Sequence, residues 1–183
     1  MSKKYTIITY GCQMNHHDSE KISYLLETLG YTKEDDLEKS DFIIYNTCLV
    51  RENAELKVYG QLGALKNLKR KKPEMIIAVC GCMMQTGDAR ATIISKYKHV
   101  DIIFGTKNIS RLPSLIARHR STGEVIVDIE EEDIIDDETP INREHPFIAY
   151  VNIMTGCNHY CTFCIVPYAR GKEISRTPES IIN

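Results

Sequence analysis

Across the first 128 residues, short apolar runs alternate with segments in which apolar side chains recur at helical spacing. The β-branched and aromatic runs predict strands at 5–10, 41–47, 75–81, 101–105 and 124–129. Helices are predicted over the segments that contain Ile22, Leu25, Leu26 and Leu29, then Val58, Leu62, Leu65 and Leu68, then 88–97 and 110–119. Residues 31–40 could hold a short extra strand. Because the strands are apolar almost throughout and alternate with helices, we predict a parallel sheet with helices on both faces, a Rossmann- or flavodoxin-like α/β fold.

An acidic run at 128–138 interrupts this pattern. It holds eight Asp and Glu residues and no Lys or Arg, so that like charges oppose packing there. We therefore predict an N-terminal α/β domain over 1–128, an acidic linker over 129–145 and the start of a second domain over 146–183. A solvated edge of the first domain is the alternative interpretation of the run.

The second domain is predicted to begin with a strand at 147–154, which leads directly into three cysteines. A helix is predicted to start at Pro178, with Thr177 as its N-cap residue. One strand and part of a helix do not make a complete fold, so we expect only the beginning of this domain in the chain.

Outside the acidic run the chain is basic, with 23 Lys and Arg against 25 − 8 = 17 Asp and Glu. This surplus suits a polyanion partner, but it is common on proteins that bind none. The basic segment 66–72 ends a predicted helix, where the helix dipole favours cations, so a solvated helix end explains it better than a nucleic-acid contact. The charge alone does not identify a partner.

The chain contains no run near the ~20 apolar residues that a membrane helix needs, and its first ten residues lack the apolar core of a secretory signal. We therefore expect a cytoplasmic protein and no membrane partner. In such a reducing compartment, the seven cysteines indicate metal binding or catalysis before disulfides.

Three of the cysteines, Cys157, Cys161 and Cys164, have the spacing C-x3-C-x2-C. A structural zinc site and an ordinary ferredoxin cluster each take four protein ligands. Three thiolates on a four-iron cluster would leave one iron open to a small molecule. Alternatively, His159 could complete a Cys3His zinc site.

The other four cysteines follow predicted strands. Cys12 and Cys48 come after the first and second strands, and Cys80 and Cys82 close the third. The carboxyl ends of parallel strands share one edge of the sheet, where ligands bind in open α/β folds. Gly81 indicates a turn, which favours Cys82 as the metal ligand and Cys80 as a core residue. A buried apolar role for each cysteine is the alternative.

Four segments together resemble the methylthiotransferase family of radical S-adenosylmethionine (SAM) enzymes, over essentially the whole chain. They read GCQMN (11–15), NTCLVRE (46–52), GCMMQ (81–85) and GCNHYCTFCIVPYARGKEISR (156–176). The first motif is most similar to the branch that adds a 2-methylthio group to N6-isopentenyl adenosine beside the anticodon of tRNA. The branches that act on threonylcarbamoyl adenosine or on a ribosomal protein are the alternatives within the family.

The resemblance implies two 4Fe-4S clusters, each held by three cysteines. Cys157, Cys161 and Cys164 would hold the cluster that binds SAM, with Phe163 near the adenine of SAM. Cys12, Cys48 and Cys82 would hold an auxiliary cluster. The implied partners are SAM, the anticodon stem-loop of tRNA, an electron donor and a sulfur donor. No catalytic side chain is implied.

The second domain would be the start of a radical SAM (β/α) barrel. Because the rest of the barrel and the family's RNA-binding domain do not follow, we expect this chain to be inactive alone. A non-catalytic zinc or iron–sulfur binding module is the alternative outside the family. Arg170, Lys172 and Arg176, which follow the cysteine loop, could contact phosphate or the SAM carboxylate, or could be surface residues.

Overall fold

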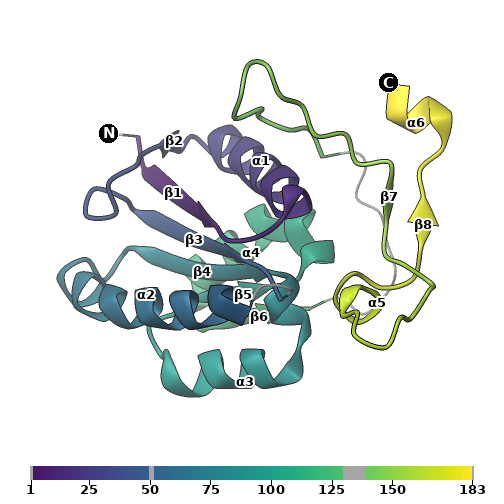
Figure 1. Cartoon of the computed structure of the whole chain (residues 1–183). Coiled ribbons are helices and arrows are strands. Elements are labelled where there is room, and N and C mark those ends of the chain that lie inside the picture. Colours follow the sequence, from purple (N-terminus) through teal and green to yellow (C-terminus); the bar gives the residue numbers. More distant parts are fainter. Residues whose placement is uncertain (1, 50–51, 130–138, 183) are drawn as a thin grey trace.

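The computed structural model describes residues 2–49, 52–129 and 139–182, so most of the predicted linker lies outside the described residues. Its main feature is a six-stranded sheet with the order β2-β1-β3-β4-β5-β6, in which every neighbouring pair is parallel (Figure 1). The strands are β1 (Lys4–Thr9), β2 (Thr32–Lys33), β3 (Phe42–Thr47), β4 (Ile76–Gly81), β5 (Ile102–Phe104) and β6 (Ile126–Asp128). The predicted parallel α/β fold is confirmed, and β2 is the extra strand considered for residues 31–40.

Helices cover both faces of the sheet. Side chains of α1 (Gln13–Thr28) and α4 (Leu112–Thr122) share one buried apolar cluster with Phe42 and Ile44 of β3. Side chains of α2 (Glu52–Lys71) and α3 (Gly87–Lys96) share the other with Ile43 and Tyr45. Successive residues of a strand point to opposite faces, so a strand covered on both sides must be apolar at every position. This burial explains the unbroken apolar runs in the sequence.

The predicted helix at 110–119 is in fact two consecutive helical segments. A 3-10 helix, η2 (Thr106–Arg111), comes first, and α4 follows with Pro113 in its first turn. Proline is tolerated in a first turn because its missing N–H would have no intrahelical acceptor there. A second 3-10 helix, η1 (Cys82–Gln85), joins β4 to α3.

The predicted strand at 147–154 is wrong over most of its length. Only Met154 and Thr155 form a strand, β7 (Met154–Thr155), which pairs antiparallel with β8 (Ile174–Ser175). Within the described part of the chain, residues 147–153 have no strand to pair with, and Phe147 is 97% exposed. Apolar β-branched composition favours a strand only where a partner supplies hydrogen bonds. The predicted barrel start therefore stays a prediction.

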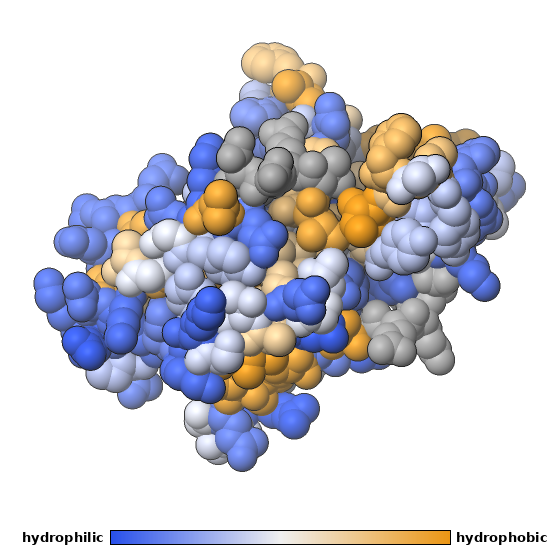
Figure 2. All heavy atoms as spheres, turned by 60° about the horizontal axis from the view of Figure 1, so that its bottom comes forward, coloured by the Kyte–Doolittle hydropathy of each residue, from blue (hydrophilic) through white to orange (hydrophobic). Residues whose placement is uncertain are grey.

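Two short helices complete the C-terminal part, α5 (Val166–Arg170) and α6 (Pro178–Ile182). The predicted start of α6 is confirmed, because the Ser180 N–H donates to the Thr177 hydroxyl at 3.2 Å, as an N-cap contact requires. Several large apolar side chains of this part are exposed, and apolar surface lies in patches among hydrophilic atoms on the face drawn in Figure 2. None of the helices described is both long and apolar enough to span a membrane.

Candidate metal-binding site

The register of the sheet brings three cysteine-bearing loops to one edge. Thr9 of β1 pairs with Asn46 of β3, and Asn46 pairs with Cys80 of β4, so the three strands end at the same level. Cys12 and Cys48 follow two of these strand ends, and Cys82 lies just beyond the third as the first residue of η1. The predicted convergence of these loops at the carboxyl edge is thereby confirmed.

Two asparagine side chains, Asn15 and Asn46, connect the start of α1 to the end of β3 by hydrogen bonds. The Asn15 side chain donates to Asn46 Oδ1 and to the Thr47 carbonyl, both at 3.1 Å, and its own Oδ1 accepts from the Cys12 backbone N–H at 3.4 Å. Asn46 Nδ2 donates in return to the Asn15 carbonyl at 2.8 Å. Both side chains are fully buried, so these hydrogen bonds are stronger than exposed ones and costly to break. They fix the Cys12 loop against the residue that precedes Cys48.

Glycines precede two cysteines of this sheet edge because no side chain would fit. A Cβ on Gly81 would lie 2.3 Å from the Thr47 carbonyl oxygen, and Gly81 has a φ of +96°. A Cβ on Gly11 would lie 2.4 Å from Asn15 Oδ1. The glycine in each GC pair therefore allows the cysteine loop to pack against the buried asparagine contacts.

The four thiols of this edge differ in how deeply they are buried. Cys48 and Cys82 are 1% and 5% exposed, whereas Cys12, the N-cap residue of α1, is partly exposed. Burial raises the pKa of the Cys82 thiol to about 11, against the opposite effect of a nearby guanidinium. Cys80 belongs to the apolar cluster under α1 and α4, and burial raises its pKa well above the usual value. The expected core position of Cys80 is confirmed.

The guanidinium beside Cys82 belongs to Arg170, the last residue of α5. Arg170 Nε donates to Cys82 Sγ at 3.1 Å, and Arg170 Nη2 donates to Asp18 Oδ2 at 2.7 Å. The sequence left Arg170 open between a contact with phosphate or the SAM carboxylate and a position on the surface. Nothing in the local sequence links residues 18, 82 and 170, which meet only in the folded chain.

The second cysteine trio, Cys157, Cys161 and Cys164, lies in one loop between β7 and α5. The first trio is Cys12, Cys48 and Cys82. Cys161 is exposed, and Cys157 and Cys164 are partly exposed. Gly156 has a φ of +74°, and the Cys157 N–H donates to the Gly171 carbonyl at 3.1 Å, which closes the loop at its base. Phe163 is 96% exposed, so its ring is free to contact a ligand.

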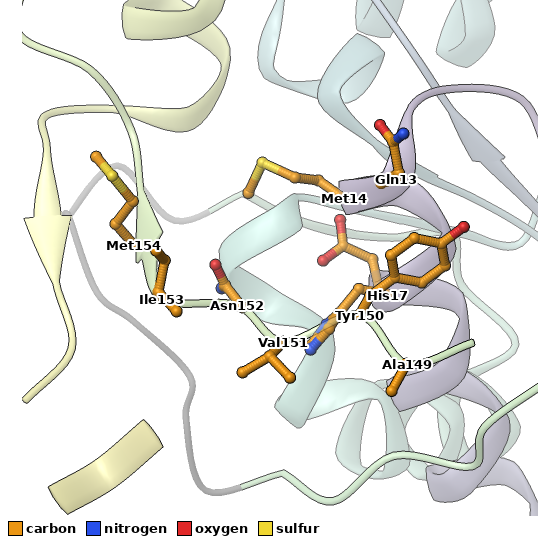
Figure 3. A pocket seen from close by; sticks show the side chains of 10 residues that line it. Gln13, Met14, His17, Ala149, Tyr150, Val151, Asn152, Ile153 and Met154 are labelled. Carbon is orange, nitrogen blue, oxygen red and sulfur yellow. The ribbon is translucent and has the colours of Figure 1, made fainter. Parts of the chain in front are cut away.

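A mainly apolar cavity of about 270 Å³ separates the start of α1 from the segment that leads into this loop. Figure 3 shows residues Ala149–Met154 running past the first turns of α1, with Met14 and His17 on the α1 side. Burial lowers the pKa of His17. The residues that line the cavity begin directly after Cys12 and end three residues before Cys157 in the sequence.

The thiols fit an iron–sulfur cluster by their chemistry, since soft thiolates are the ligands that such clusters prefer. Among the described residues, no group of three His, Cys, Asp or Glu side chains is arranged closely enough to hold a single metal ion. A cluster of four irons and four sulfides is much wider than one ion and holds its thiolates further apart. Cys12, Cys48 and Cys82 lie on three loops of one sheet edge and are the candidate ligands of such a cluster.

Fold and site together define a parallel α/β protein with two cysteine trios as candidate metal ligands. The chain belongs to the family described as "Uncharacterized protein family UPF0004", whose profile matches residues 4–105, more than half of the chain. The matched residues include strands β1 to β5 and the loops that carry Cys12, Cys48 and Cys82, but not β6.

Curated relatives extend the similarity over nearly the whole chain. A protein of Finegoldia magna named tRNA-2-methylthio-N(6)-dimethylallyladenosine synthase is 65% identical over 179 residues, which are 98% of this chain and 39% of that protein. Proteins with the same name from Alkaliphilus oremlandii and Clostridioides difficile are 53% and 55% identical over 99% and 96% of this chain, and over 39% and 37% of their own lengths. The chain thus spans about two fifths of the length of these relatives.

Proposed function

We propose that the chain is the N-terminal part of a radical SAM tRNA methylthiotransferase that adds a 2-methylthio group to N6-isopentenyl adenosine beside the anticodon. The names of the relatives support the substrate, and the C-x3-C-x2-C loop supports the radical SAM chemistry. The observation that carries the proposal is the meeting of the Cys12, Cys48 and Cys82 loops at one edge of the sheet, beside the segment that holds the other trio.

In this proposal Cys157, Cys161 and Cys164 hold one 4Fe-4S cluster, and Cys12, Cys48 and Cys82 hold an auxiliary one. When bound, the cluster on Cys157, Cys161 and Cys164 would supply an open iron for SAM and the electron that cleaves SAM. The auxiliary cluster would be the site connected with the inserted sulfur. The exposed ring of Phe163 lies in the loop between two ligands and is the candidate contact for the adenine of SAM.

The remaining side chains position the thiols. The Asn15 and Asn46 hydrogen bonds hold the loops of Cys12 and Cys48, and burial of Cys48 and Cys82 keeps water from that side of the auxiliary site. Metal binding displaces the thiol protons, so the raised pKa of Cys82 in the metal-free chain opposes but does not prevent ligation. Cysteine thiols stay reduced in the cytosol, and we therefore propose a cytoplasmic protein that receives electrons and sulfur from partner molecules.

Anaerobic reconstitution of the 183-residue chain with iron and sulfide tests the proposal. Two clusters predict about eight irons per chain and an EPR signal of the reduced protein that changes when SAM is added. Cys82→Ala should lose about half of the iron, and the matched variant Cys80→Ala should keep all of it. A colourless chain with stoichiometric zinc, or equal iron losses in the two variants, contradicts the proposal.

Because the chain spans two fifths of its relatives, we further propose that it binds iron but does not methylthiolate tRNA on its own. Closed surroundings are needed to keep a radical from water and side reactions. Nucleoside mass spectrometry after incubation with SAM, reductant and tRNA carrying the isopentenyl group checks this. Methylthiolated nucleoside formed by the purified chain would overturn it.

A further inference from the structure

Arg170 connects the two cysteine-bearing parts of the chain. It ends α5, directly after the loop of Cys157, Cys161 and Cys164, and it donates to the sulfur of Cys82 at 3.1 Å. Its other donor contact goes to Asp18 of α1 at 2.7 Å. One guanidinium thus bonds both a ligand of the first trio and a carboxylate beside that trio.

This contact is buried, unlike most surface ion pairs. Arg170 and Asp18 have side chains that are 8% and 13% exposed, and Cys82 is 5% exposed. A buried guanidinium is stable only where its charge and its N–H groups are satisfied, and here Asp18 supplies the charge and Cys82 a second acceptor. The planar fork of arginine can reach both partners at once, which the single ammonium of lysine cannot do in the same geometry.

We infer that Arg170 is a positioning residue for the auxiliary cluster, which orients the Cys82 sulfur and stabilises the negative charge that collects on it. The inference rests on the proposed function. Hydrogen bonds to cluster sulfurs and nearby charge set the reduction potential of an iron–sulfur cluster. A donor and a positive charge both favour the reduced form, which carries one more electron, so Arg170 raises this potential.

Asp18 acts in the opposite direction on the same cluster. Its carboxylate neutralises much of the guanidinium charge that Cys82 would otherwise experience. Removing the Arg170 charge should therefore lower the reduction potential, and removing the Asp18 charge should raise it. A contact that only joins two parts of the chain would not give effects of opposite sign.

The test measures the midpoint potential of the auxiliary cluster alone. In the reconstituted chain, Cys157, Cys161 and Cys164 are replaced by Ala, and the remaining cluster takes up one electron from dithionite in an EPR-monitored titration. We expect Arg170→Met to shift the midpoint potential to more negative values and Asp18→Asn to shift it to more positive ones. Arg118→Met, an exposed arginine of α4, is the matched control and should cause no shift.

Arg170→Lys separates charge from geometry, and we expect a negative shift smaller than that of Arg170→Met. Iron release to a chelator gives a second measurement, which should be faster in Arg170→Met than in the control. If Arg170→Met fails to hold a cluster, the positive shift of Asp18→Asn still decides. Shifts of the same sign in both variants, or no shift in either, overturn the inference.

These outcomes are distinct from a failure of the proposed function. A parent chain that takes up zinc, or that holds no cluster on Cys12, Cys48 and Cys82, refutes the proposed function before any Arg170 variant is compared. If the parent chain holds both clusters but the midpoint potential is unchanged by substitution of Asp18 or Arg170, only the role of Arg170 is refuted.

Discussion

Gly81 is the residue on which the edge of the sheet depends most directly. Its φ of +96° is strained for any residue with a side chain, and a Cβ would lie 2.3 Å from backbone oxygen of Thr47. We expect Gly81→Ala to lower the free energy of unfolding by about 3 kcal/mol or more, from backbone strain and from the steric clash. Urea denaturation of the metal-free chain measures this loss.

Gly60 offers the matched control, because it lies exposed in α2 and its Cβ would contact nothing within 4 Å. Gly60→Ala should stabilise the chain by about 0.5 to 1 kcal/mol through helix propensity. A Gly81→Ala variant as stable as the parent would mean that the β4–η1 turn adapts freely, and the explanation of the GC pairs would fail.

At the level of elements, the buried asparagine pair joins α1 to β3. Asn46 Nδ2 donates to the Asn15 carbonyl and to the Ser19 hydroxyl, and Asn46 Oδ1 accepts from Asn15. Asn46→Ala removes these three buried hydrogen bonds, so we expect a loss of about 2 to 4 kcal/mol in the free energy of unfolding. Asn142→Ala breaks a single, exposed hydrogen bond to Glu27, so it should lower the free energy of unfolding by well under half as much. Similar losses in the two variants would contradict a special role for the pair.

Element prediction from sequence succeeded where each element has a partner within the same domain. Strands such as β3 and β4 are buried on both faces, and this burial is directly visible as an unbroken apolar run. The run at 147–154 has the same composition but no strand beside it among the described residues, so only Met154 and Thr155 pair. Residue composition indicates only the preference of a segment for strand structure. Whether the segment pairs depends on whether another strand lies beside it.

At the level of the whole molecule, parallel topology made part of the candidate site predictable. Once the strands are known, their carboxyl ends must share an edge, so Cys12, Cys48 and Cys82 could be grouped without coordinates. The link from Arg170 to Cys82 and Asp18 could not be predicted in this way. It depends on how residues 139–182 dock against the sheet domain, and no sequence periodicity encodes that contact.

This docking includes several polar contacts along α1, and Glu20 makes two of them. Glu20 is 4% exposed, its Oε1 accepts from the Glu144 N–H at 3.0 Å, and its carbonyl accepts from the Asn142 N–H at 3.1 Å. Glu20→Ala removes the acceptor of Glu144, so we expect faster amide exchange in peptides covering 139–150 and unchanged exchange in β3 and β4. Hydrogen exchange with mass spectrometry of the complete chain measures both.

The exposed Glu38 is the control, and Glu38→Ala should leave exchange unchanged in all of these peptides. Residues Ala149–Met154 line the cavity against α1, so loosening at 139–150 should also speed amide exchange in peptides covering 151–154. Unchanged exchange at 139–150 would mean that the remaining contacts, such as those of Arg170 and Asn142, are sufficient to hold the two parts together.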